Sequence, residues 1–123
     1  MQIKAMVPVL VCHQLDSTLA FYQQVFNCIV VNQRAGDAGL EWVHLKTDNI
    51  FIMLVRQSEN QPQPQSSDKN LFYYYTDDIE SYYRFIRARG FKPTELQTTE
   101  HGMKEFFLVD PEGNRLAIGQ SVL

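Results

Sequence analysis

The order of the expected elements repeats once along this chain, and the repeat restricts the fold more than any other feature. Each half shows the apolar pattern of a strand, a helix and three further strands, with matching elements about 64 positions apart. Each half is too short for an independent domain, so we expect one domain over residues 1–123, with modules at 1–55 and 71–123. We predict an α+β fold in which paired βαβββ modules form a curved, half-open mixed β-sheet barrel with helices outside.

The first module begins with an apolar run at residues 5–12, which predicts a strand. Asp16-Ser17 is the expected cap of a helix whose apolar residues recur at helical spacing. Residues 29–31 predict a short strand that is followed by a glycine-containing loop. The remainder of the module predicts a hairpin of residues 40–46 and 50–55.

The second module begins with an aromatic strand at residues 71–76. The acidic pair at 77–78 is the expected cap of a second helix, and Gly90 stands where a left-handed residue would end it. Residues 104–118 predict another hairpin, in which Gly113 supplies the positive φ of the turn.

Between the modules, residues 56–70 contain no apolar side chain except two prolines. Such a segment cannot bury enough surface to offset its ordering entropy, so we expect an exposed and mobile linker.

Charge and composition exclude several classes of protein. Eleven basic and 14 acidic residues give a net charge of −3, which does not favour nucleic acid. The longest apolar run is far too short for a membrane-spanning helix and lacks the flanks of a signal peptide. We therefore expect a cytoplasmic protein without nucleic-acid or membrane partners. Cys12 and Cys28 show no CxxC spacing and are expected to be reduced core residues.

Three segments carry a resemblance to a known family: residues 7–27, 71–91 and 101–120. The last is the most specific, because Gly-Met-Lys-Glu-Phe is followed by Asp-Pro-Glu-Gly-Asn and a final Gly-Gln. The chain resembles the vicinal oxygen chelate superfamily of glyoxalases, dioxygenases and fosfomycin- and bleomycin-resistance proteins, and within it the bleomycin-resistance branch. Lys104 stands where arginine is usual, and His101 where tyrosine or tryptophan is common.

The resemblance also implies where a metal would bind. Enzymes of the superfamily hold a divalent cation at four strand positions that align with Val7, Met53, Leu71 and Ala117. None of these side chains suits a hard or borderline divalent cation, since methionine is at best a soft thioether ligand. We therefore expect no metal, no other cofactor and no catalytic residue.

If these four positions face inward, the strand period of two assigns the rest of that face. Within this face we expect His44 to be hydrogen-bonded and Glu105 to be held by a basic neighbour such as Arg115. The expected ligand-binding residues are mostly aromatic: Trp42, His44, Phe51, Met53, Tyr73, Tyr75, Glu105, Phe107 and Arg115.

By resemblance, the expected function is antibiotic resistance by sequestration of a flat or cationic drug-like molecule, with bleomycin-type drugs as candidates. Two alternatives stay open. One is a metal-dependent lyase, isomerase or dioxygenase with displaced ligands such as His13, His44 and Glu105, and the other is a protein-interaction module. The resemblance also implies a homodimer, in which the first strand can be exchanged. Pro8 in that strand suits an edge or crossing position.

Overall fold

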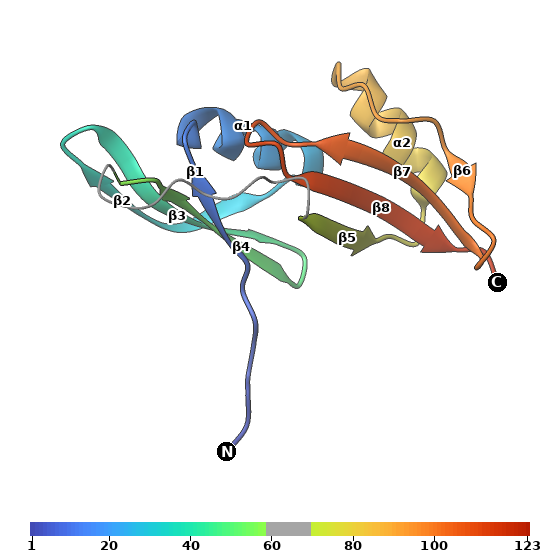
Figure 1. The fold of residues 1–123 in the computed structure, drawn as a ribbon, viewed down its shortest axis with the longest axis horizontal. Coiled ribbons are helices and arrows are strands. Elements are labelled where there is room, and N and C mark those ends of the chain that lie inside the picture. The colour runs from blue at the N-terminus through green and yellow to red at the C-terminus, as the bar shows by residue number, and fades with distance from the viewer. Residues whose placement is uncertain (59–69) are drawn as a thin grey trace. The chain divides into compact units, whose positions relative to one another are not determined.

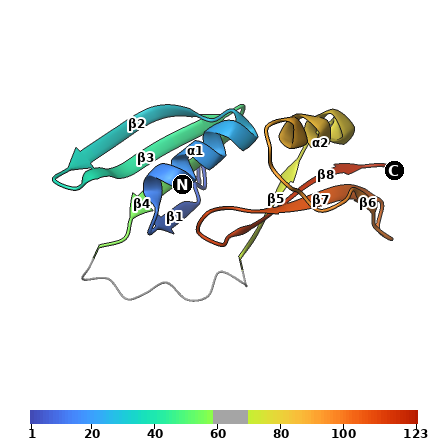
Figure 2. The same cartoon turned by 90° about the horizontal axis from the view of Figure 1, so that it is seen from above.

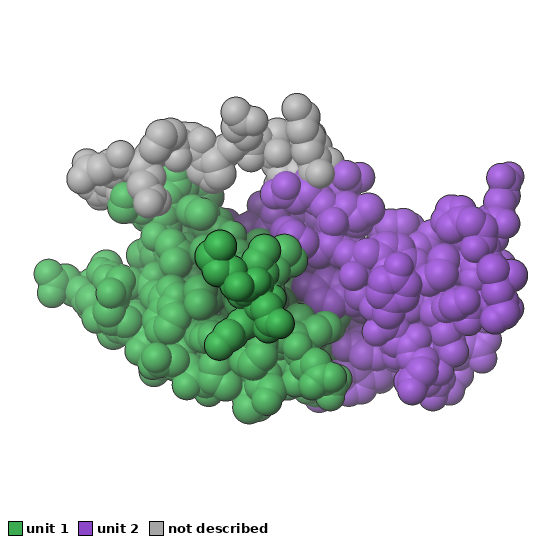
Figure 3. All heavy atoms as spheres, turned by 90° about the horizontal axis from the view of Figure 1, so that it is seen from below, with its two compact units in different colours: residues 1–64 green, residues 65–123 purple. Residues whose placement is uncertain are grey.

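The computed structural model describes residues 1–58 and 70–123, so most of the expected linker at 56–70 lies outside the described residues. The chain divides into two compact units, Met1–Pro64 and Gln65–Leu123, which Figure 3 colours separately. Each unit is described by itself. Neither of the two described helices is long and apolar enough to cross a membrane.

The first unit is a βαβββ module with one four-stranded mixed sheet (Figure 1). The spatial order is β1-β4-β3-β2, in which β1 runs parallel to β4 and the other pairs are antiparallel. The helix α1 packs against β3 and β4 (Figure 2). The elements are β1 (Val9–Cys12), α1 (Leu15–Phe26), β2 (Ile29–Gly36), β3 (Gly39–Thr47) and β4 (Ile50–Arg56).

The second unit repeats this plan, with the order β5-β8-β7-β6 and β5 parallel to β8. The helix α2 packs against β7 and β8. The α+β class and the paired βαβββ modules are therefore confirmed. The elements are β5 (Leu71–Tyr75), α2 (Ile79–Ala88), β6 (Gln97–Thr98), β7 (Met103–Val109) and β8 (Arg115–Ser121).

The repeat extends to the pairing of individual residues. Val9 pairs with Met53 in the first sheet, and Tyr73 pairs with Ala117 in the second. Each residue of the second pair lies 64 positions after its counterpart in the first. The two modules thus share a register as well as an order of elements.

Each sheet buries the face that its helix covers. In the first module the alternating strand residues Val43, Leu45 and Leu54 have no exposed surface, and Tyr22 of α1 is equally buried. Such alternation is typical of a sheet with one face packed on a core. The corresponding buried strand residues of the second module are Phe106, Leu108, Leu116 and Ile118.

The first helix differs from the expectation at its N-terminus. It begins at Leu15, and Gln14 at the N-cap position makes no side-chain capping bond. Instead, the hydroxyl of Thr18 donates to the carbonyl of Gln14 at 2.8 Å. Asp16 lies in the first turn, where a carboxylate still favours the positive end of the helix. Asn27, with a φ of 53°, ends the helix in the left-handed conformation.

The second helix matches the expectation at both ends. Asp78 is its N-cap and accepts a hydrogen bond from the backbone N–H of Ser81 at 3.2 Å. Gly90 has a φ of 92°, and the N–H of Phe91 donates to the carbonyl of Ile86, as in a Schellman motif.

Two strands have different bounds from those expected. β2 continues to Gly36, through residues that were expected to form a loop, because it pairs with β3 along its whole length. Residues 32–34 of β2 are polar and exposed, as is typical of an edge strand. They therefore show no alternation of apolar and polar side chains that would predict a strand. β1 begins only at Val9, since Pro8 has no N–H to donate, although its carbonyl accepts from Met53 at 2.9 Å.

Candidate ligand-binding faces

The sheet face of the first module that points away from α1 carries the four residues expected there: Trp42, His44, Phe51 and Met53. All four are half-buried, whereas the residues that alternate with them are buried under the helix. The imidazole of His44 lies between two rings, with centroid distances of 6.0 Å to Trp42 and 5.3 Å to Phe51. Lys46 places its ammonium 5.6 Å from the centroid of Phe51. We call this surface the module-one face.

The hydrogen bonding of His44 differs from the expectation. Its Nε2 atom is buried and has no hydrogen-bond partner in the described part of the chain. A buried polar atom without a partner is destabilising by about 1–3 kcal/mol. The described contacts of the imidazole are those with the rings of Trp42 and Phe51.

The face of the second module that points away from α2 carries the other five expected residues: Tyr73, Tyr75, Glu105, Phe107 and Arg115. Their neighbours Phe106 and Leu116 are fully buried on the helix side, so the alternation is the same as in the first module. Tyr73 and Tyr75 lie with their ring centroids 5.0 Å apart at an interplanar angle of 46°. We call this surface the module-two face.

Glu105 has a different partner from the one expected. The hydroxyl of Tyr73 donates to its Oε2 atom at 2.6 Å, whereas Arg115 lies opposite Val109, further along the sheet. Burial and the interaction with Glu105 raise the pKa of Tyr73 well above its ordinary value, so the phenol stays protonated as a donor. Gly119 lies between the strands of these two residues, and it leaves room for the hydroxyl of Tyr73 because it has no side chain.

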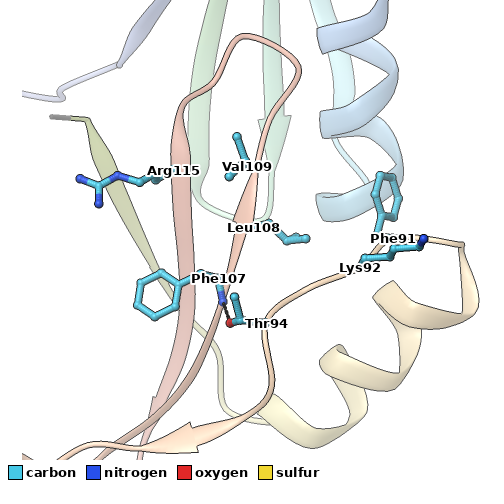
Figure 4. Close-up of a pocket in the computed structure, with 7 residues that line it drawn as sticks. All are labelled: Phe91, Lys92, Thr94, Phe107, Leu108, Val109 and Arg115. Atoms are coloured by element: carbon cyan, nitrogen blue, oxygen red, sulfur yellow. Dashed lines mark hydrogen bonds between the residues drawn. The ribbon is translucent and has the colours of Figure 1, made fainter. Parts of the chain in front are cut away.

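A pocket of about 440 Å³ lies on the second module, at the edge of β7 (Figure 4). Its volume is within the usual range of small-molecule sites, roughly 300–1,000 Å³. Two expected residues, Phe107 and Arg115, line it, and the other lining residues were not among those expected from the sequence: Phe91, Lys92, Thr94, Leu108 and Val109.

The sequence indicates a short element around residues 94–98, but not the hydrogen bonds that Thr94 makes to β7. β6 pairs only with Lys104 and Glu105, so the next part of the β7 edge has no neighbouring strand. Thr94 supplies both missing interactions there: its N–H donates to the carbonyl of Phe107 at 3.0 Å, and its hydroxyl accepts from the N–H of Phe107 at 2.9 Å (Figure 4). A single residue that pairs in this way produces no periodic pattern.

The four positions aligned with metal ligands do not fit a metal site. Met53 lies half-buried on the module-one face, Leu71 is exposed, and Ala117 is fully buried between Tyr73 and Phe107 in the sheet. Val7 precedes β1. None offers an oxygen, imidazole or thiolate donor. Residues 1–58 and 70–123 contain no group of three or more His, Cys, Asp or Glu that could hold a metal ion.

The cysteines and the other histidines do not form a reactive site. Cys12 and Cys28 are buried thiols outside any disulfide. Burial raises the pKa of Cys28 to about 11, which disfavours the nucleophilic thiolate. His13 and His101 are both exposed.

Two βαβββ modules, each with an open sheet face opposite its helix, define the class of paired-module α+β proteins. The sequence matches the Glyoxalase/Bleomycin resistance protein/Dioxygenase superfamily over residues 4–118, and the chain belongs to this family. No curated protein matches the chain in sequence.

Solved structures show the same fold at low identity. TioX from Micromonospora sp. ML1 is 17% identical with a TM-score of 0.77, covering 96% of this chain and 98% of that chain. A bleomycin-binding protein complexed with bleomycin is 21% identical with a TM-score of 0.73, covering 97% and 99%. Lactoylglutathione lyase from Agrobacterium tumefaciens is 23% identical with a TM-score of 0.72, covering 95% and 92%. A bleomycin-binding protein and a lyase thus share this fold.

Proposed function

We propose that this chain is a metal-free small-molecule binding protein of the bleomycin-resistance type, which acts by sequestering a flat or cationic drug-like compound. The observation that carries the proposal is the chemistry of the two open sheet faces. Each presents aromatic side chains, and the four positions that align with the metal ligands of the superfamily's enzymes hold Val7, Met53, Leu71 and Ala117. The likeness to a bleomycin-binding protein supports the same class of function, and bleomycin-type drugs are the first compounds to test.

The open faces suit flat ligands for a physical reason. A conjugated ligand gains from the removal of apolar surface from water, and each aromatic contact adds about 0.5–1.5 kcal/mol beyond that area. Trp42 and Phe51 on the module-one face, and Tyr75 and Phe107 on the module-two face, retain exposed ring surface. The nine residues expected from the sequence are therefore proposed as the ligand contacts.

The second candidate is a metal-dependent enzyme of the same superfamily, which the similarity to a lactoylglutathione lyase favours. It would require displaced ligands, of which His44 and Glu105 lie on the open sheet faces of their modules. His44 belongs to the first module and Glu105 to the second, and Glu105 already accepts a hydrogen bond from Tyr73. Two such ligands fall short of a catalytic metal shell of three protein side chains.

The experiment that separates the two candidates combines metal analysis with a binding titration. Protein prepared without chelator and then exposed to Zn, Mn, Ni and Fe salts is analysed by mass spectrometry. We expect less than about a tenth of an equivalent of metal per chain. Bleomycin and other flat compounds are then titrated while the fluorescence of Trp42, the single tryptophan, is followed. A stoichiometric metal that is lost in His44→Ala or Glu105→Gln would contradict the sequestration proposal and favour an enzyme.

We also propose that the chain forms a homodimer. The segment before β1 is exposed and includes Ile3 and Met6, apolar residues that are 95% and 83% accessible to solvent. Burial against a second copy would remove this surface from water. Light scattering should give the mass of two chains, and the double substitution Ile3→Ser and Met6→Ser should shift it toward that of one. An unchanged mass would exclude this segment as a contact.

The two unbridged cysteines suit a reducing compartment, and we propose that the protein is located in the cytoplasm.

A further inference from the structure

The module-two face contains a carboxylate whose charge is only partly compensated. Glu105 is half-buried and lies directly opposite Gly119 of β8. Its Oε2 atom accepts the hydrogen bond from Tyr73. A neutral phenol satisfies one oxygen as a donor but supplies no positive charge.

No basic side chain of the described residues forms an ion pair with Glu105. Lys104, its neighbour in β7, points to the other side of the sheet and pairs with Glu80 of α2. Arg115 lies opposite Val109, four residues along β7, which corresponds to about 13 Å along the strand. A partly desolvated carboxylate gains most from a cation that approaches closely, and the residues that the structure describes do not supply one at this position.

Two further aromatic residues, Tyr75 and Phe107, lie on the same sheet face as Glu105. Tyr75 pairs with Gly119 from β5, and Glu105 pairs with the same glycine from β7, so these two residues lie on either side of Gly119, above which the hydroxyl of Tyr73 lies. Their Cα atoms are separated by two strand spacings, about 10 Å. Tyr75 is 75% exposed, and Phe107 is the next residue of β7 on this face. Exposed ring faces beside a carboxylate attract organic cations by cation–π interaction.

We propose that Glu105, Tyr75 and Phe107 form a subsite for the positively charged nitrogen of an aromatic cation, with Tyr73 holding the carboxylate in place. This inference rests on the proposed function and specifies it, because it assigns the ligand a permanent or protonated cationic nitrogen. The carboxylate supplies the charge, and the rings supply the stacking surface. A neutral flat molecule would use the rings alone and would bind more weakly.

The test compares two compounds of nearly the same shape and different charge. N-methylacridinium is a permanent cation, and acridine is neutral at pH 7.5. Equilibrium dialysis with absorbance detection gives the affinity of each for the full chain, for Glu105→Gln and for Glu100→Gln. The last variant is the matched control, because Glu100 is an exposed carboxylate in the turn between β6 and β7. Circular dichroism and the melting temperature check that each variant is folded.

We expect the wild type to bind N-methylacridinium at least about tenfold more tightly than acridine. Glu105→Gln should remove most of this preference, while its acridine affinity changes by less than about twofold. Glu100→Gln should behave like the wild type. If Glu105→Gln does not fold, Tyr75→Leu provides the second variant, with at least about a threefold loss for the cation only.

Three results would overturn the subsite: equal affinity for the two compounds, an undiminished preference in both the Glu105 and the Tyr75 variants, or binding of neither compound. With the first two results, binding of flat compounds and thus the proposed function would still stand. If neither compound bound, the titrations that follow Trp42 would decide the proposed function separately.

Discussion

Single residues on the two open faces differ in how their polar atoms are satisfied. On the module-one face, the buried Nε2 of His44 has no partner in the described part of the chain. On the module-two face, Glu105 accepts from Tyr73 across a glycine. The unpartnered nitrogen of His44 lowers the stability of the fold. The bond between Tyr73 and Glu105 depends on the absence of a side chain at Gly119. Both can be tested by substitution.

Replacement of His44 by phenylalanine should not destabilise the protein. It keeps a ring between Trp42 and Phe51 and removes the unsatisfied nitrogen, so the free energy of unfolding should stay constant or rise by up to about 1 kcal/mol. His44→Ala should instead lower it by about 1–3 kcal/mol, because the ring contacts are lost. Urea denaturation measures both. A loss of more than about 1 kcal/mol in His44→Phe would show that the imidazole has a polar partner in solution.

Replacement of Gly119 by alanine should displace Tyr73. The added methyl would lie 2.8 Å from the Cζ atom of Tyr73 and closer still to its hydroxyl, so the bond to Glu105 would break. We expect a loss of about 1–3 kcal/mol in the free energy of unfolding. In a Tyr73→Ala background the same change should cost much less, and urea denaturation of the double-mutant cycle measures the difference. Equal costs in the two backgrounds would contradict the steric explanation.

The side of the sheet on which each site residue lies could be predicted from the sequence, but its partner could not. Strand alternation placed Trp42 and His44 opposite the helix, as observed, because one face of each sheet must bury its apolar residues. The bond from Tyr73 to Glu105 joins β5 to β7 across β8. It depends on the room above Gly119, which no pattern along the chain reveals. The expectation that Arg115 would hold Glu105 was wrong for this reason.

Individual elements could be predicted where local chemistry determines them. The N-cap Asp78 and the left-handed Gly90 follow from backbone requirements at helix ends. The length of β2 and the role of Thr94 could not be predicted, because edge residues with polar side chains owe their conformation to the neighbouring strand. At this scale, pairing across the sheet overrides the local pattern.

The capping of α2 predicts a pH-dependent stability. Hydrogen bonding from Ser81 lowers the pKa of Asp78, so the ionised carboxylate stabilises the folded state. This contribution is present above the ordinary pKa of an aspartate and is lost as the pH falls through the lowered value in the folded state. Asp78→Ala should therefore reduce the melting temperature by a few degrees at neutral pH, and the difference should narrow below about pH 4.

Asp78→Asn is the control for this prediction, because the amide oxygen still accepts from Ser81 but carries no charge. The Asp78→Asn variant should melt close to the wild-type temperature at neutral pH. Its remaining advantage in melting temperature over Asp78→Ala should not depend on pH. A difference between Asp78→Ala and the wild type that persists unchanged at low pH would contradict the assignment of the effect to the carboxylate.

The whole molecule repeats one module, and the repeat raises the question of whether the modules are independent. Each sheet keeps large apolar residues exposed on its open face, including Val9, Val11 and Val109. A module of this size buries a small fraction of its unfolded surface and has a correspondingly small margin of stability. We therefore propose that the two modules fold as one domain over residues 1–123.

This proposal predicts a single cooperative transition in urea. Trp42 reports only on the first module, whereas far-UV circular dichroism reports on the helices and strands of both. Modules that depend on each other must lose structure together, so the two signals should give the same midpoint and the same slope. Residues 1–58 expressed alone should lack the cooperative transition, since a module of this size buries too little surface to be stable by itself. Midpoints that differ by more than about 0.5 M urea would instead show that each module has enough core to fold by itself.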